Sequence, residues 1–196
     1  YKITYKFLWG DTVENYLKQS YEDYQLLLLT EKHIKTIFNW NIQEKNFEYY
    51  TCRPLKLSKS FEEYASKTLS TISEGKEIIY VLVNREDCNK PLGKITLFDL
   101  NTRNHSAEFG YYLPDNNRGH GLGSIMLSKF IQNSFKNEEL NLNKIYATTS
   151  SNNYPSMKLL EKYGFKLDGR LREHYWIGEN RYDQLIYSIL KQEWIK

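Results

Sequence analysis

The stretch AEFGYYLPDNNRGHGLGS, residues 107–124, decides the fold. Its apolar and aromatic part, Phe109 to Leu113, is typical of a strand and runs into a Pro-Asp-Asn-Asn turn. Three alternating glycines follow, and the pattern predicts an amphipathic helix directly after them. Glycine lets the backbone approach a ligand closely, and the first N–H groups of a helix lie unpaired at the positive end of its dipole. A strand, a glycine-rich turn and a helix start in this order therefore predict a site for a pyrophosphate.

Two common phosphate-binding motifs do not fit this turn. A P-loop has a lysine after its last glycine, and this sequence has Ser124 there. In the dinucleotide fingerprint GxGxxG, Gly119 and Gly121 would fit, but the third glycine would fall on Ser124. We also find no βαβ unit with an acidic residue about 20 positions further on. Neither a nucleoside triphosphate nor a dinucleotide is favoured.

The composition indicates one globular domain. The chain has 196 residues, 40% hydrophobic and 26% charged, which suits a single hydrophobic core. Its 27 basic and 24 acidic residues are interspersed, so we expect no nucleic-acid partner. We find neither a signal peptide nor an 18-residue apolar run, and expect no membrane span. Cys52 and Cys88 have no metal-ligand or CxxC spacing, so we expect no metal and a reducing, cytoplasmic location.

The hydrophobic pattern predicts the element order β-α-α-β-β-β-α-β-α-β-β. Strands are predicted over 24–29, 77–83, 92–100, 105–113, 143–149, 165–176 and 182–190, and helices over about 31–40, 61–73, 122–137 and 155–163. Short connections favour antiparallel neighbours, so the fold class is mixed α/β (α+β) with a mostly antiparallel sheet. A capping box of Ser60 and Glu63 is predicted to open the second helix. Residues 1–21 are expected to form an N-terminal extension, and residues 22–196 a single domain. The extension could pack on the core as a structural element, or it could be an arm for substrate specificity or dimer formation.

The glycine turn also resembles a known family. Arg118 to Gly123 matches the pattern Q/R-x-x-G-x-G/A of the GNAT acyl-CoA N-acyltransferases. The stretches 92–95 and 106–113 resemble the central strands of the Rim-type branch, the ribosomal-protein N-terminal (alanine/serine) acetyltransferases. Asn153 to Phe165 fits that branch's pattern N-x-x-S-x-x-x-L-E-x-x-G-F, and segments 169–172 and 183–188 also fit. The resemblance covers about residues 24–190 and implies a GNAT-like twisted sheet of about seven strands with four main helices.

The resemblance implies a coenzyme A site. The strand before the turn would splay from its neighbour, and the pantetheine arm would pair there with the backbone of Tyr112 and Leu113. Asn153 would hold the cofactor by hydrogen bonds, unless it only caps its loop. The pyrophosphate would lie on the backbone N–H groups of Arg118, Gly119, His120, Gly121, Leu122, Gly123 and Ser124. Acetyl-CoA would be the cosubstrate, without a metal.

The resemblance also implies a catalytic pair. Glu108 corresponds to the family's general base, acting directly or through a water, although a purely structural carboxylate is the alternative. Many members have a tyrosine general acid at the position of Leu160. Ser156 would therefore protonate the leaving thiolate instead. Ser156 could instead bond only to backbone, in which case Tyr154 or Tyr163 would be the acid.

The acceptor is expected to be a primary amine that attacks the thioester directly. An α-amino group has a pKa near 7.7–8.0 and a lysine near 10.4. A peptide N-terminus is therefore the amine that a single carboxylate base deprotonates most easily. The alternatives are a small amine, such as an aminoglycoside or polyamine, and a non-catalytic acyl-CoA-binding module. A polyamine would favour an acidic cleft, and the sequence has few acidic clusters. Acceptor choice is assigned to residues 31–73 and to Tyr175, Trp176 and Tyr182, which could line a pocket or fill the core. The chain would act as a monomer or homodimer.

Overall fold

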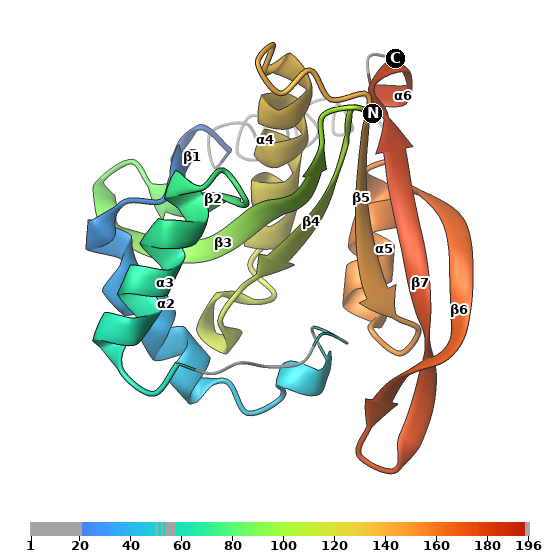
Figure 1. The fold of residues 1–196 in the computed structure, drawn as a ribbon, viewed down its shortest axis with the longest axis horizontal. Coiled ribbons are helices and arrows are strands. Elements are labelled where there is room, and N and C mark those ends of the chain that lie inside the picture. Colours follow the sequence, from blue (N-terminus) through green and yellow to red (C-terminus); the bar gives the residue numbers. More distant parts are fainter. Residues whose placement is uncertain (1–20, 50, 52, 54–57, 195–196) are drawn as a thin grey trace, which may run out of the picture.

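A computed structural model describes residues 21–49, 51, 53 and 58–194 (Figure 1). Its seven strands form one sheet in the order β1-β2-β3-β4-β5-β7-β6. The strands are β1 (Tyr24–Leu28), β2 (Ile78–Asn84), β3 (Asp87–Asn101), β4 (Ser106–Tyr112), β5 (Lys144–Ser150), β6 (Lys166–Ile177) and β7 (Asn180–Leu190). The helices are α2 (Glu31–Gln43), α3 (Phe61–Ser73), α4 (Leu122–Lys136), α5 (Tyr154–Lys162) and α6 (Lys191–Trp194), with 3-10 turns η1 (Phe47–Tyr49) and η2 (Asp115–Asn117). The predicted order and fold class are confirmed.

The sheet divides between β4 and β5. These two strands are parallel, whereas all the remaining neighbouring pairs are antiparallel. Their register runs only from Ser106 opposite Lys144 to Glu108 opposite Tyr146. Beyond Glu108 the two strands diverge, and Figure 1 shows the widening gap between them. The splayed strand expected from the resemblance is therefore present.

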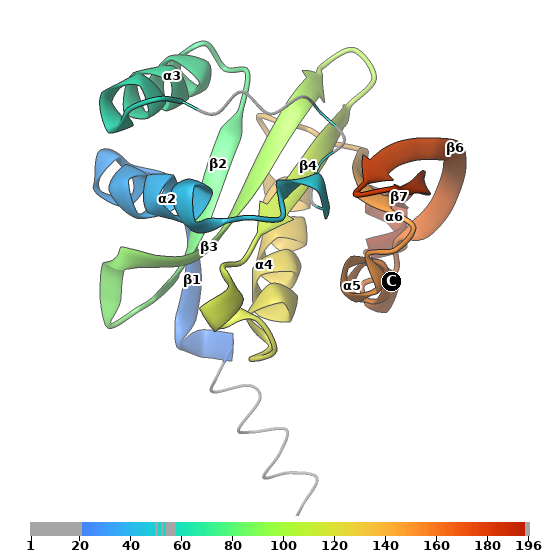
Figure 2. The ribbon, with the colours of Figure 1, turned by 90° about the horizontal axis from the view of Figure 1, so that it is seen from below.

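Helices cover both faces of the sheet. Helices α2 and α3 lie on one side of β2–β4 and α4 lies on the other (Figure 2). Successive strand residues alternate between these layers because the side-chain period of a strand is two. In β2, Leu82 belongs to the core under α4, whereas Val81 and Val83 pack with Ile37 of α2. By the same alternation Phe109 enters the α4 core, and its neighbour Glu108 faces the side of α2 and α3.

The hairpin between β2 and β3 is tighter than predicted. The sequence predicts a turn over 84–91, but β3 begins at Asp87, so only Arg85 and Glu86 lie between the strands. Two register shifts around Val83 absorb the extra residues, and Pro91 stands opposite Val83 at this irregularity. A bulge tolerates a proline in a strand, which is why the turn-forming residues misled the prediction.

The capping box at α3 is half confirmed. The Ser60 hydroxyl accepts a hydrogen bond from the Glu63 N–H at 3.2 Å. The Glu63 carboxylate accepts one from the N–H of Lys59 at 2.8 Å, one residue earlier than the pattern requires. Both side chains of the predicted capping box therefore accept a backbone N–H, but Glu63 accepts that of Lys59 and not that of Ser60.

Residues 1–20 lie outside the described residues, so the N-terminal extension and its domain boundary stay predictions. Among the described helices, none has the length and apolar character needed to cross a membrane.

Candidate active site

The glycine turn adopts a backbone that favours glycine. Gly119 has φ +81° and Gly121, the N-cap of α4, has φ +77°. No heavy atom lies within 4 Å of the position that a Cβ would take at either residue. The turn therefore requires glycine for its left-handed backbone, not for close packing.

The turn leaves a run of backbone donors free. The N–H of Arg118 donates to Asp115 O at 3.1 Å, and the N–H of Ser124 donates to Gly121 O at 3.0 Å. Within the part of the chain that the structure describes, the N–H groups of residues 119–123 make no backbone hydrogen bond. Unpaired donors at the start of a 15-residue helix suit a pyrophosphate, and five of the seven residues predicted to form this pyrophosphate cradle, 118–124, have such a free N–H group.

Arg118 holds the shape of this turn through its side chain. Its Nε donates to the carbonyl of Leu113 at 2.8 Å, and its guanidinium pairs with Glu44 at 3.3 Å. The Glu44 side chain, 4% exposed, also accepts from the Tyr112 hydroxyl at 2.9 Å. Burial raises the pKa of Glu44, but hydrogen bonds from Asn46, Tyr112 and Arg118 outweigh it and lower the pKa overall. The end of β4, the turn and the end of α2 are therefore joined by one buried carboxylate.

Two contacts at the cradle were not expected from the sequence. Lys162, at the end of α5, donates to the Ser124 hydroxyl at 3.2 Å, which brings a cation beside the turn. The Tyr163 hydroxyl donates to the carbonyl of Ser124 at 2.8 Å. Tyr163 therefore joins α5 to α4, Tyr154 is 65% exposed, and the role of either as the alternative acid stays a prediction.

The slot between β4 and β5 begins where their pairing ends. Tyr112 is the last residue of β4 and Leu113 directly follows it, so both lie beyond Glu108, the last residue of β4 that pairs with β5. Asn153 caps α5 by accepting from the Ser156 N–H at 3.3 Å, and it lines a cavity of about 370 Å³ with Tyr49 and Pro155. Its cap role is thus observed, and its hydrogen bonds to a cofactor stay a prediction.

Glu108 is a buried carboxylate at the point of divergence. It is 7% exposed, accepts from the Thr148 hydroxyl at 3.0 Å and pairs with Arg53 at 2.8 Å. Arg53 also pairs with Asp99 at 2.8 Å and packs over the Phe98 ring at 4.7 Å from its centroid. Burial raises the pKa of Glu108, while Thr148 and Arg53 act in the opposite direction. A raised pKa makes the carboxylate a stronger proton acceptor, which suits a general base.

Arg53 was missed by the sequence analysis. It lies outside any helix or strand, between η1 and α3, where no periodicity or motif marks it.

Ser156 makes a hydrogen bond that the sequence did not predict. Its hydroxyl lies 2.7 Å from the hydroxyl of Tyr111, so bonding to backbone alone is wrong. Burial raises the pKa of Tyr111 to about 12, against a smaller opposite effect of Ser156. Because Tyr111 is three residues after Glu108 on β4, it lies on the opposite face. Strand alternation was the signal that could have paired Tyr111 with α5.

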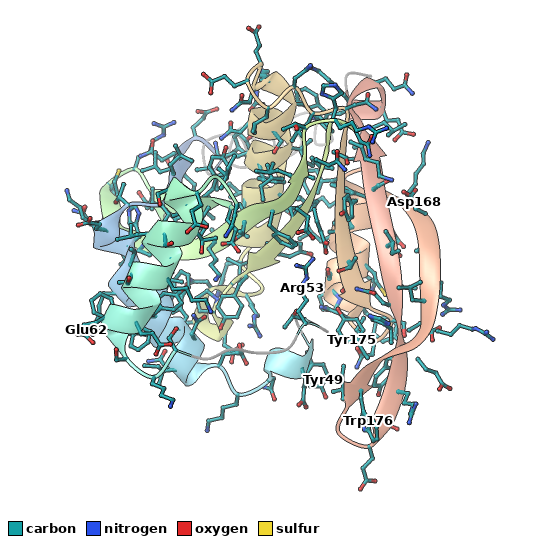
Figure 3. The ribbon with its side chains drawn as sticks, in the orientation of Figure 1. Tyr49, Arg53, Glu62, Asp168, Tyr175 and Trp176 are labelled. Carbon is teal, nitrogen blue, oxygen red and sulfur yellow. The ribbon has the colours of Figure 1, made fainter. Side chains whose placement is uncertain are left out.

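A cavity of about 860 Å³ opens on the other face of β4, beside Glu108. Side chains from α3, β3 and β4 line it, together with Arg53 and Tyr175. Tyr175 is 3% exposed whereas Trp176 is 68% exposed, with Arg181 stacked on its ring. In Figure 3, Arg53 lies between strand β4 and the β6–β7 hairpin. Tyr175 and Trp176 belong to the hairpin, and Trp176 lies near its tip. Of the hairpin aromatics, Tyr175 therefore lines the pocket.

The chain matches a family model over most of its length. Residues 25–166 match the acetyltransferase (GNAT) domain. The chain belongs to the GNAT acetyltransferase family. It is therefore an acyltransferase with acetyl-CoA as cosubstrate, and the free N–H groups at α4 fit the pyrophosphate of that cosubstrate. Among the described residues, no group of three His, Cys, Asp or Glu side chains could hold a metal.

Relatives of this GNAT chain are N-acetyltransferases by name. The "Putative ribosomal N-acetyltransferase YdaF" of Bacillus subtilis is 32% identical over 52% of this chain and 55% of its own length. The chain thus spans about half of that relative. Spermidine N(1)-acetyltransferase of Vibrio cholerae is 26% identical over 87% of this chain and 94% of its own. A crystal structure of the Vibrio cholerae spermidine N-acetyltransferase with CoA and spermine has a TM-score of 0.79 at 24% identity, covering 89% of this chain and 99% of that one.

Proposed function

We propose that this enzyme acetylates the primary amine of a small molecule bound in the cavity beside Glu108. The observation that carries the proposal is the cavity itself, about 860 Å³ and bounded by α3 and the sheet. Sites for small ligands typically measure about 300–1,000 Å³. Spermidine N(1)-acetyltransferase, which aligns with 87% of this chain, supports an acceptor of this size class.

Glu108 is the general base of the proposed reaction. The amine reaches the site mainly as an ammonium, and Glu108 accepts its proton directly or through a water. Thr148 fixes one carboxylate oxygen, and Arg53 on the other oxygen favours the ionised form. Acetyl-CoA supplies an activated thioester carbonyl, to which the neutral amine adds. A positioned base of this kind contributes typically about 10²–10⁴-fold to the rate.

Ser156 and Tyr111 serve the thiolate side. Because burial holds the pKa of Tyr111 at about 12, its hydroxyl keeps its proton throughout the physiological range. When the Ser156 hydroxyl donates its proton to the leaving thiolate, Tyr111 donates one to Ser156 through their 2.7 Å contact, and Tyr111 then regains a proton from water. The N–H groups of residues 119–123, with Asn153 and the backbone of Tyr112 and Leu113, hold the cosubstrate in this proposal.

A peptide α-amino group is the second candidate. Its pKa near 7.7–8.0 makes it easier to deprotonate than an alkylamine. The name of the Bacillus subtilis relative favours it, although the match covers about half of each chain. A cytoplasmic location and a monomeric or homodimeric state also stay predictions. One related structure is described as dodecameric, so oligomers occur among the neighbours of this fold.

Thiol release from acetyl-CoA tests the proposal. We expect release with a panel of small primary amines, confirmed by mass spectrometry of the acetylated product. Short peptides with free N-termini form the second arm, and the same peptides with blocked N-termini are its control. Turnover with peptides alone would replace the first candidate by the second, and no turnover with either would refute both.

A further inference from the structure

Lys94 occupies an unusual position for a lysine. It lies in the middle of the central strand β3, with Val81 opposite it on β2 and Tyr112 opposite it on β4. It is half-buried and lines the large cavity. In the part of the chain that the structure describes, Lys94 has neither an ion pair nor a side-chain hydrogen bond. A lysine so placed is rarely left without an anionic partner.

The side of α3 that lines the cavity carries polar residues beside Tyr64. Lys67, Thr68 and Thr71 of this helix line the cavity, and none of the helix's residues is buried. A helix that packs on a sheet usually turns an apolar stripe toward it. This side of α3 therefore faces a polar ligand site, and Lys67 brings a second cation to it.

The cavity lining carries Lys67, Lys76 and Lys94 together with Glu77, Asp99 and Glu108, and Lys76 pairs with Glu74. The acids Asp99 and Glu108 both pair with Arg53, where the amine reacts. Lys94 lies four residues before Phe98, the partner of Glu108 across the sheet. At about 3.3 Å per residue this places the backbone of Lys94 roughly 13 Å from that of Phe98. Neither Lys94 nor Lys67 has an acid partner among the described residues.

We propose that the acceptor carries an anionic group, a carboxylate or a phosphate, that Lys94 and Lys67 bind while its amine lies at Glu108. The inference rests on the proposed function, because it names the class of amine that the same cavity accepts. The amine and the anion are separated by on the order of 10 Å, the span along β3 between Lys94 and Phe98. The hydroxyls of Thr68 and Thr96 complete the anion site, since both line the same cavity. A polyamine lacks this anion and would place a further cation against two lysines.

Four eight-carbon amines test this specificity because they share length and reacting group. They are octylamine, diaminooctane, aminooctanoate and aminooctyl phosphate. We expect kcat/KM for the better of the two anionic amines to exceed that of octylamine roughly tenfold, which corresponds to one charge-assisted contact. Diaminooctane should fall below octylamine. The ranking of aminooctanoate against aminooctyl phosphate identifies which anion the site takes.

Lys94→Met removes the charge with little change of volume and should abolish the preference for the anionic amines over octylamine. Lys90→Met is the matched control, because Lys90 is an exposed lysine of the same strand outside the cavity lining. Calorimetry of octanoate with the CoA-loaded enzyme gives a readout without turnover, and Lys94→Met should weaken that binding roughly tenfold. Equal rates for octylamine and both anionic amines, or a preference kept by Lys94→Met, overturn the inference. Absence of acetylation for every amine refutes the proposed function instead, and octanoate binding then decides the anion site alone.

Discussion

Replacing Glu108 by glutamine is the most direct test of the catalytic site. Glutamine keeps the size and the carbonyl oxygen of the side chain, so Thr148 can still donate its 3.0 Å hydrogen bond. Arg53 loses one anionic partner but keeps Asp99 at 2.8 Å. The substitution thus removes the ability to take a proton and leaves the surrounding contacts nearly intact.

The expected loss in kcat is about 10²–10⁴-fold, the range for a positioned general base. Acetyl-CoA binding should not change, because Glu108 is not among the residues proposed to hold the cosubstrate. Stability at neutral pH should not fall. A carboxyl whose pKa is raised on folding stabilises the fold when protonated, and this contribution is lost as the pH rises through the raised pKa. Glutamine has no carboxyl to ionise, so the variant does not lose stability through this ionisation as the pH rises.

Thiol release measured against pH distinguishes a base from a structural carboxylate. In the wild type, kcat should fall as the pH drops through the raised pKa of Glu108, and Glu108→Gln should lose this acid limb. Asp99→Asn is the control, since it alters the same Arg53 cluster but keeps the Glu108 carboxylate; because the Asp99 charge raises the pKa of Glu108, the acid limb should move to lower pH and persist. A Glu108→Gln variant with wild-type kcat, or an Asp99→Asn variant equally impaired, would refute the assignment of Glu108 as the base.

Three further predictions concern the thiolate side, the cradle and the turn. Tyr111→Phe should lower kcat by less than about 100-fold without changing the KM for acetyl-CoA, and adding Ser156→Ala should cause little further loss because the two hydroxyls act together; additive losses would contradict the pair. Gly121→Ala should cost about 1 kcal/mol at φ +77° and raise the KM for acetyl-CoA in steady-state assays, whereas an unchanged KM would separate this turn from the cosubstrate. Glu44→Gln should destabilise the protein by about 1–3 kcal/mol at neutral pH. Its lowered pKa means that this stabilisation is lost as the pH falls through the folded pKa, so the melting temperatures of variant and wild type should converge in acid.

The strands and helices were predictable because their signals are local. The 3.6-residue and two-residue periods of apolar side chains located all four main helices and seven strands to within a few residues, with β3 the exception. There, pairing with β2 turned Asp87 to Pro91 into strand despite their turn-forming character. Long-range pairing decides such segments, and no short window of sequence contains it.

The candidate site was predictable only in part. A motif marks Glu108 and the glycine turn, because their chemistry depends on neighbours in the chain. No motif identifies Arg53 or Tyr111, because their partners are distant in the sequence. Arg53 binds Glu108, 55 residues away, and Tyr111 binds Ser156, 45 residues away.

The sequence by itself determined the order of elements, the glycine cradle and the family resemblance, because hydrophobic period, backbone φ requirements and helix-end donors are properties of contiguous residues. Only the tertiary structure decided which charges meet in the cavity. Burial of Glu108, its pairing with Arg53 and the unpaired state of Lys94 all depend on which distant segments pack over the divergence of β4 and β5. Solvent exclusion and distance set the strength of each charge, and both exist only once the chain has folded.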